Sequence, residues 1–148
     1  MQIQRILVIG AGTMGRQIAM SAALVGYNTT LNDISGEALT AAGRELDKWA
    51  AGRVAKGKLT QADADAALAR LERSTDLDAA AGNADLVIEA AVEKLEVKKA
   101  LFEQLGRSTP AHAILATNSS TLASSHVAQA SGRRTWCATC TSSTRPWS

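Results

Sequence analysis

A glycine-rich turn between an apolar run and a helical pattern constrains this chain more than any other feature. The uncharged run Ile6–Ile9 ends at Gly10, and the segment Gly10–Gly15 fits the pattern Gly-x-Gly-x-x-Gly. An uncharged, β-branched run without polar alternation is typical of a parallel strand that is buried on both faces. After such a strand, the first glycine permits a tight turn, the second lets a pyrophosphate approach the backbone, and the third lets helix and strand pack closely.

The residues after the turn predict a helix and then a second strand. Apolar residues recur at helical spacing from Thr13 to Val25, and Gly26 is a typical C-terminal stop. A second strand is expected over residues 28–33. Strand, helix and strand in this order form a right-handed βαβ unit, because that crossover packs the helix back onto a twisted parallel sheet. The apolar residues that recur at this spacing are Met14, Ile18, Ala22 and Val25.

The alternation of helices and strands continues to about residue 130. Ser35 can cap a helix that runs to about Lys56, and Thr60 can cap another that runs to about Arg73. Together they predict a helical hairpin over about 35–73, inserted after the second strand. A strand over 84–89, a helix over 95–105 and a strand over 113–117 follow. We therefore expect an α/β, Rossmann-type doubly wound parallel sheet in a single domain over 1–132, followed by an irregular tail over 133–148.

Asp33 stands at the end of the second expected strand, where a carboxylate can accept hydrogen bonds from the adenosine ribose hydroxyls of a dinucleotide. A 2′-phosphate there would be repelled, so the sequence favours NAD over NADP as the cofactor. The alternative is that the glycines only shape a turn and Asp33 only caps the next helix. The residues predicted to contact the cofactor are Gly10, Gly12, Thr13, Met14, Gly15 and Asp33.

Composition narrows the class of partner. The chain has 148 residues, 46% of them hydrophobic, which suffices for one packed core without disulfides or a metal. Charges of both signs are interspersed and sum to +2, so we expect neither a nucleic-acid-binding face nor a polybasic membrane patch. No apolar run is long enough to span a bilayer. We expect a soluble, cytoplasmic protein with a small-molecule partner.

Several further segments match one known family in the same order. The chain resembles the 3-hydroxyacyl-CoA dehydrogenases, specifically the 3-hydroxybutyryl-CoA dehydrogenase branch, from about residue 3 to about residue 132. The resemblance implies NAD-dependent oxidation of the 3-hydroxyl group of a 3-hydroxyacyl-CoA to a 3-oxo group. The segments that carry it are 10–19, Asn32-Asp33, 54–60, 85–93 and 116–122.

The resemblance also implies roles for individual residues. It assigns Glu93, Lys98 and Asn118 to the cofactor, the first two on its nicotinamide side, and it assigns Ser120 to a hydrogen bond with the 3-oxygen of the substrate. In the family the helical hairpin contacts coenzyme A. The residues expected to meet its phosphates are Arg53, Lys56 and Lys58. The alternatives are a solvated helix start for Glu93 and Lys98, a helix cap for Ser120 and loose surface cations on the hairpin.

The tail departs from the family. In the family a histidine takes the proton of the substrate hydroxyl, and such a base needs a pKa near the working pH. This histidine would fall at position 141, where the present chain has Thr141. Codons can be chosen for Cys140–Pro146 that, when the reading frame is shifted by two bases, encode His-Phe-Phe-Asn-Pro. This is the segment that contains the histidine in the family. We therefore expect a one-base deletion near the codons for Arg133 and Arg134, with loss of the helical C-terminal domain and its dimer contacts. The Trp-Cys-x-x-Cys string at 136–140 then has no redox or metal role.

The sequence leaves two other functions open. The chain could be a non-catalytic NAD-binding module that works as the short form. It could also belong to a dehydrogenase of another 3-hydroxy acid, although the hairpin lysines and the Asn118–Ser120 string favour an acyl-CoA. As a truncated enzyme it is expected to bind NADH with little or no turnover by itself.

Overall fold

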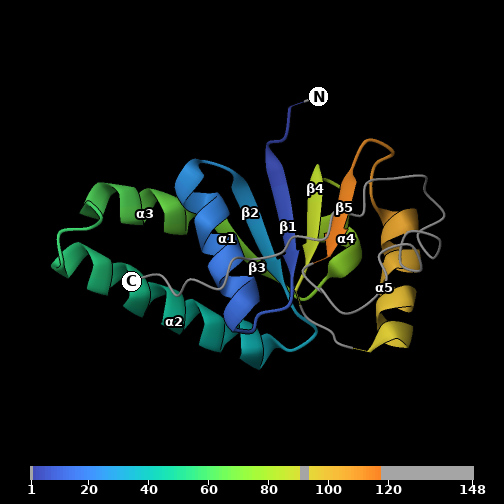
Figure 1. Ribbon diagram of the computed structural model, residues 1–148, viewed down its shortest axis with the longest axis horizontal. Coiled ribbons are helices and arrows are strands. Elements are labelled where there is room, and N and C mark those ends of the chain that lie inside the picture. The colour runs from blue at the N-terminus through green and yellow to red at the C-terminus, as the bar shows by residue number, and fades with distance from the viewer. Residues whose placement is uncertain (1, 91–93, 118–148) are drawn as a thin grey trace.

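The computed structural model describes residues 2–90 and 94–117, which form a parallel sheet with helices on both faces (Figure 1). The strands lie in the order β3-β2-β1-β4-β5, and every neighbouring pair is parallel. The α/β fold expected from the sequence is confirmed. In chain order the elements are β1 (Arg5–Ile9), α1 (Thr13–Val25), β2 (Asn28–Asn32), α2 (Gly36–Ala55), α3 (Gln61–Arg70), β3 (Leu71–Ser74), α4 (Leu77–Ala81), β4 (Leu86–Glu89), α5 (Leu95–Ser108) and β5 (Ile114–Thr117).

The direction of winding reverses at β1. From β1 the chain moves outward through β2 to β3, and it then returns to pair β4 against the other side of β1. The connections that leave β1 and β4 therefore diverge at the carboxyl ends of these strands. In open α/β sheets this divergence forms the crevice in which ligands bind.

Both faces of the sheet are covered by apolar side chains. On one face, Leu7 and Val87 pack with Phe102 and Leu105 of α5. On the other face, Val8 and the neighbouring strand residues pack against α1 and the start of α2. A third cluster joins α1 to the α2–α3 hairpin, which extends to the left of the sheet in Figure 1. This third cluster comprises Met20, Ala23, Leu46, Ala50, Ala64 and Ala67.

The structure differs from the expected elements in two places. The helix expected to reach Arg73 ends at Arg70, because Leu71–Ser74 pairs with β2 as an edge strand. The short helix α4 was not expected at all, although Asp76 caps it by accepting from the Ala79 amide at 3.1 Å. Val25, one of the apolar residues at helical spacing in α1, is 75% exposed, because the buried face of α1 is formed by Gly15, Ala19, Met20 and Ala23.

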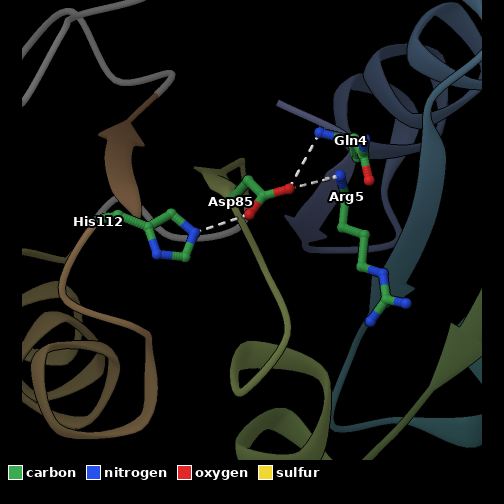
Figure 2. A network of polar contacts seen from close by, with 4 residues as sticks. All are labelled: Gln4, Arg5, Asp85 and His112. Atoms are coloured by element: carbon green, nitrogen blue, oxygen red, sulfur yellow. Dashed lines mark hydrogen bonds and ion pairs between the residues drawn. The ribbon is translucent and has the colours of Figure 1, made fainter. Parts of the chain in front are cut away.

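Asp85 fastens the amino ends of three neighbouring strands (Figure 2). One carboxylate oxygen accepts from the backbone N–H groups of Gln4 and Arg5, each at 3.0 Å, and the other lies 2.8 Å from Nε2 of His112. The hydrogen bond from His112, followed by that from the Gln4 amide, lowers the pKa of Asp85 below its ordinary value. This carboxylate therefore ties the segments entering β1 and β5 to the start of β4.

Among the helices of the described residues, none is both long and apolar enough to cross a membrane. The same residues contain no group of three or more His, Cys, Asp or Glu side chains that could hold a metal ion.

Candidate functional site

The glycine-rich turn lies where β1 ends and α1 begins. Gly10 has a φ of 107°, a left-handed conformation that side chains other than glycine rarely adopt. A Cβ at Gly15 would overlap the Gly10 carbonyl, so the turn and the helix are in contact through backbone atoms. A Cβ at Gly12 would meet no atom within 4 Å. The first and third glycines are thus required by the fold itself, whereas Gly12 opens onto free space at the helix N-terminus.

The first turn of α1 is suited to an anion. Gly12 is the N-cap and offers no side-chain acceptor, and the first turn contains no acidic residue. The first amides of a helix have no intrahelical acceptor, and the helix dipole makes this end positive. Thr13 and Met14 supply such amides beside the open space at Gly12. Free N–H groups at this place can cradle a pyrophosphate.

Asp33 lies beside the glycine turn and is joined to it. Its Oδ2 accepts from the Ala11 amide at 3.0 Å, and its Oδ1 accepts from the Ser35 amide at 2.9 Å. The side chain is only partly buried. Each carboxylate oxygen can accept further hydrogen bonds, so both remain able to meet ribose hydroxyls. The cap of α2 is the Ser35 hydroxyl, which accepts from Ala38, so Asp33 does not serve as the helix cap.

These features fit a dinucleotide that extends across the end of the sheet. The turn provides open space and helix amides for the phosphates, and Asp33 stands at the end of β2 on one side of β1. In doubly wound sheets the two halves of a dinucleotide lie on the two sides of the switch point. The adenosine half would therefore lie over β2, and the nicotinamide half over the ends of β4 and β5.

The ends of β4 and β5 carry a buried polar cluster. Nζ of Lys98, in the first turns of α5, lies 2.9 Å from Oε2 of Glu89 and donates to Oγ1 of Thr117 at 3.1 Å. The Thr117 hydroxyl donates to the same Glu89 oxygen at 2.7 Å. Glu89, Lys98 and Thr117 are each only 1% exposed. Lys98 is therefore not part of a solvated helix start, which was the alternative that the sequence left open.

The residues expected to meet coenzyme A lie in the last turn of α2 and in the turn that leads to α3, at the end of the hairpin far from the sheet in Figure 1. The guanidinium of Arg53 lies over the ring of Trp49, 5.3 Å from its centroid. Lys56 and Lys58 are exposed. The structure brings the three together near one turn without joining them to the glycine turn.

Three of the predicted site residues, Glu93, Asn118 and Ser120, lie outside the described residues, as does the whole tail over 133–148. Sequence reasoning missed Glu89 and Thr117, which were treated as ordinary strand residues. One signal could have found Glu89, namely a carboxylate at the end of an otherwise apolar strand. Such a group is almost never fully buried unless it is paired.

Comparison with known proteins gives a consistent result. A family model described as "3-hydroxyacyl-CoA dehydrogenase, NAD binding domain" matches residues 5–140. Over 85% of its length the chain is 48% identical to 3-hydroxyadipyl-CoA dehydrogenase of Escherichia coli, and over 90% it is 38% identical to a probable 3-hydroxybutyryl-CoA dehydrogenase of Bacillus subtilis. These matches span only 26% and 46% of the two relatives.

Solved structures give the same picture. The crystal structure of 3-hydroxybutyryl-CoA dehydrogenase from Escherichia coli superposes with a TM-score of 0.84 at 47% identity, covering 86% of this chain and 27% of that one. (S)-3-Hydroxybutyryl-CoA dehydrogenase from Ralstonia eutropha gives a TM-score of 0.83 at 34% identity, covering 87% of this chain and 45% of that one. The chain thus spans less than half the length of each of these proteins.

Proposed function

Because this chain belongs to the 3-hydroxyacyl-CoA dehydrogenase family through its NAD-binding domain, we propose that it is the cofactor-binding part of an enzyme that oxidises 3-hydroxyacyl-CoA thioesters. The observation that carries the proposal is the contact between Asp33 and the Ala11 amide, which places a carboxylate beside the open glycine turn. The substrate class rests on the relatives, which are named for 3-hydroxyadipyl-CoA and 3-hydroxybutyryl-CoA.

In this proposal the chain binds and orients the cofactor. The amides of the first turn of α1 hold the pyrophosphate, Asp33 accepts the adenosine ribose hydroxyls, and Gly12 leaves the space that the phosphates need. Glu93 and Lys98 serve the nicotinamide side, and Asn118 also contacts the cofactor. When bound, NAD accepts the hydride that leaves the 3-carbon of the substrate.

Ser120 donates a hydrogen bond to the 3-oxygen of the substrate in this proposal. Removing the hydroxyl proton requires a base, and the family's histidine position holds Thr141. We therefore expect this chain to bind NADH with little or no turnover by itself. A frame that restores His-Phe-Phe-Asn-Pro would supply the base.

The cofactor assignment is tested by titrating the 148-residue chain with NADH, following the fluorescence of the nicotinamide, and by displacing NADH with ADP-ribose. Saturable binding that ADP-ribose reverses supports the proposal. No binding of either ligand to folded protein contradicts it. The activity is tested by resequencing the coding DNA from the Gly132 codon onward and assaying the restored enzyme with NAD and both thioesters.

The acyl-CoA assignment has a separate test on the hairpin. Lys56 and Lys58 should be protected from acetylation by a saturating coenzyme A thioester, whereas Lys48, exposed on the same helical hairpin, should not be. Equal labelling of all three lysines with and without thioester would count against coenzyme A binding at this turn and favour another 3-hydroxy acid.

A further inference from the structure

The buried face of α5 carries a charged residue, Lys98, near the N-terminus of the helix. Lys98, Phe102 and Leu105 follow one another at helical spacing and are all buried against the sheet. The apolar layer they join includes Leu7, Ile9 and Val87, on the same face of the sheet. At the carboxyl end of the strands this layer stops, and the next residues on that face are Glu89 and Thr117, paired in register across β4 and β5. A polar cluster thus replaces the hydrophobic core at the edge where ligands bind.

The cluster is expensive to bury, so its position calls for an explanation. Taking a carboxylate and an ammonium out of water costs several kcal/mol per ion, and replacing a buried pair with apolar residues is often neutral or stabilising. The Lys98 ammonium can donate three hydrogen bonds, and within the described residues it has two acceptors, Glu89 and Thr117. The described residues thus leave the third donor of this ammonium available to a group at the end of the sheet.

We propose that Glu89 and Thr117 are positioning residues for the nicotinamide half of the dinucleotide, acting by holding the ammonium of Lys98 at the carboxyl ends of β4 and β5. The inference rests on the proposed function, since it presupposes a dinucleotide that crosses the switch point. Thr117 has the central part, because its single hydroxyl donates to Glu89 and accepts from Lys98 at once. Without it, the ammonium keeps its counter-ion and loses its fixed direction.

The position of the cluster also fits a role at one half of the ligand. Glu89 is in register with Ile9 at the end of β1, on the side of β1 opposite to β2 and Asp33. A disturbance of the cluster should therefore leave the adenosine half unaffected. This separation distinguishes a positioning role from a general contribution to the fold.

The test compares Thr117→Val with Thr117→Ser in the full 148-residue chain. Valine keeps the shape and removes the hydroxyl, whereas serine keeps the hydroxyl. Thr29→Val is the matched control, because Thr29 is equally buried in the same sheet and its hydroxyl, among the described residues, donates only to the Tyr27 carbonyl, at 3.1 Å. For each variant the affinities for NADH and for ADP-ribose are measured, together with the melting temperature of the free protein.

We expect Thr117→Val to weaken NADH binding by about tenfold to a hundredfold, the range for a lost hydrogen bond to a charged group. ADP-ribose affinity should stay within about twofold, and Thr117→Ser and Thr29→Val should bind NADH nearly as the wild type does. If Thr117→Val does not fold, Glu89→Gln, which keeps the Lys98 ammonium and the Thr117 hydroxyl, carries the same comparison.

Three results would overturn the inference. Unchanged NADH affinity in Thr117→Val shows that the cluster does not act on the nicotinamide half. Equal loss of NADH and ADP-ribose affinity shows that the threonine is merely structural. A wild-type chain that is folded and binds neither ligand removes the proposed function, and the inference with it, whereas in the first two results the cofactor assignment stands.

Discussion

The carbonyl of Gly10 occupies the place where a side chain of residue 15 would begin, so the glycine turn and α1 touch through their backbones. Gly12 and Gly15 of the same motif are therefore glycines for different reasons. Gly15 is needed for packing, whether or not a ligand is bound, whereas Gly12 opens onto free space.

We predict that Gly15→Ala destabilises the free protein by at least about 1–3 kcal/mol, the usual cost of overpacking, because the Gly10 backbone has to move. Gly12→Ala should cost less than about 1 kcal/mol in the free protein and should still weaken NADH binding, since the methyl group enters the phosphate space. Urea unfolding and NADH titration measure the two effects. Equal stability losses in both variants would contradict this division.

Asp33 should set the preference between the two nicotinamide cofactors. Replacing it with asparagine removes the negative charge that repels a 2′-phosphate and leaves one acceptor oxygen for the Ala11 and Ser35 amides. We predict that Asp33→Asn weakens NADH binding about tenfold, the equivalent of one net hydrogen bond. The ratio between the affinities for NADH and NADPH should become smaller, because the charge that repels the 2′-phosphate is gone. Fluorescence titration with both cofactors checks this. Glu45→Gln, on the exposed side of α2, should change neither affinity.

The buried ion pair predicts strong non-additivity in stability. Lys98→Met leaves Glu89 as a buried carboxylate without its counter-ion and should cost about 3–5 kcal/mol. The double variant Glu89→Gln/Lys98→Met should recover much of that loss, because no uncompensated charge remains. A double-mutant cycle by urea unfolding measures the coupling. Additive effects of the two substitutions would show that the pair does not interact as the 2.9 Å distance indicates.

Asp85 predicts a loss of stability in acid. Its pKa is lowered in the folded state, chiefly by the hydrogen bond from His112. A carboxyl group with a depressed folded pKa stabilises the fold above its unfolded value, about 3.9, and this contribution disappears as the pH falls through the folded pKa. Asp85→Asn should therefore be less stable than the wild type at pH 7 and nearly equal to it at the acid end of the range.

Urea unfolding at neutral pH and below pH 4 checks this prediction. Asp47→Asn, on the exposed side of α2, is the control and should follow the wild type at both pH values. If the free energies of unfolding of Asp85→Asn and the wild type differ by the same amount at every pH, the charge of the carboxylate does not contribute to holding the three strands together.

The sequence predicted the sheet well where the strands are apolar and less well where they are not. β1 and β4 follow from their apolar runs, and the caps at Ser35 and Thr60 located both hairpin helices. β3 was missed because an edge strand needs no apolar run, and Leu71 is its only aliphatic residue. The α4 helix was missed because five residues contain too little periodicity.

The candidate site divides in the same way. The glycine turn and Asp33 are local in sequence, so their spacing alone predicted their meeting. The cluster at the ends of β4 and β5 joins Glu89, Lys98 and Thr117 from three separate elements. Its burial depends on how α5 packs on the sheet, and periodicity does not indicate which of two neighbouring lysines turns inward.

Helix α1 is buried on two sides, since Ala19 packs toward the sheet while Met20 and Ala23 pack toward the hairpin. Its N-terminus is also the part of the chain placed to meet the phosphates. Helix α1 therefore contacts both the proposed cofactor site and the α2–α3 hairpin, which is proposed to meet coenzyme A. We predict that amide exchange in α2 and α3 slows when the dinucleotide binds at this N-terminus, because local opening of the hairpin exposes residues packed on α1.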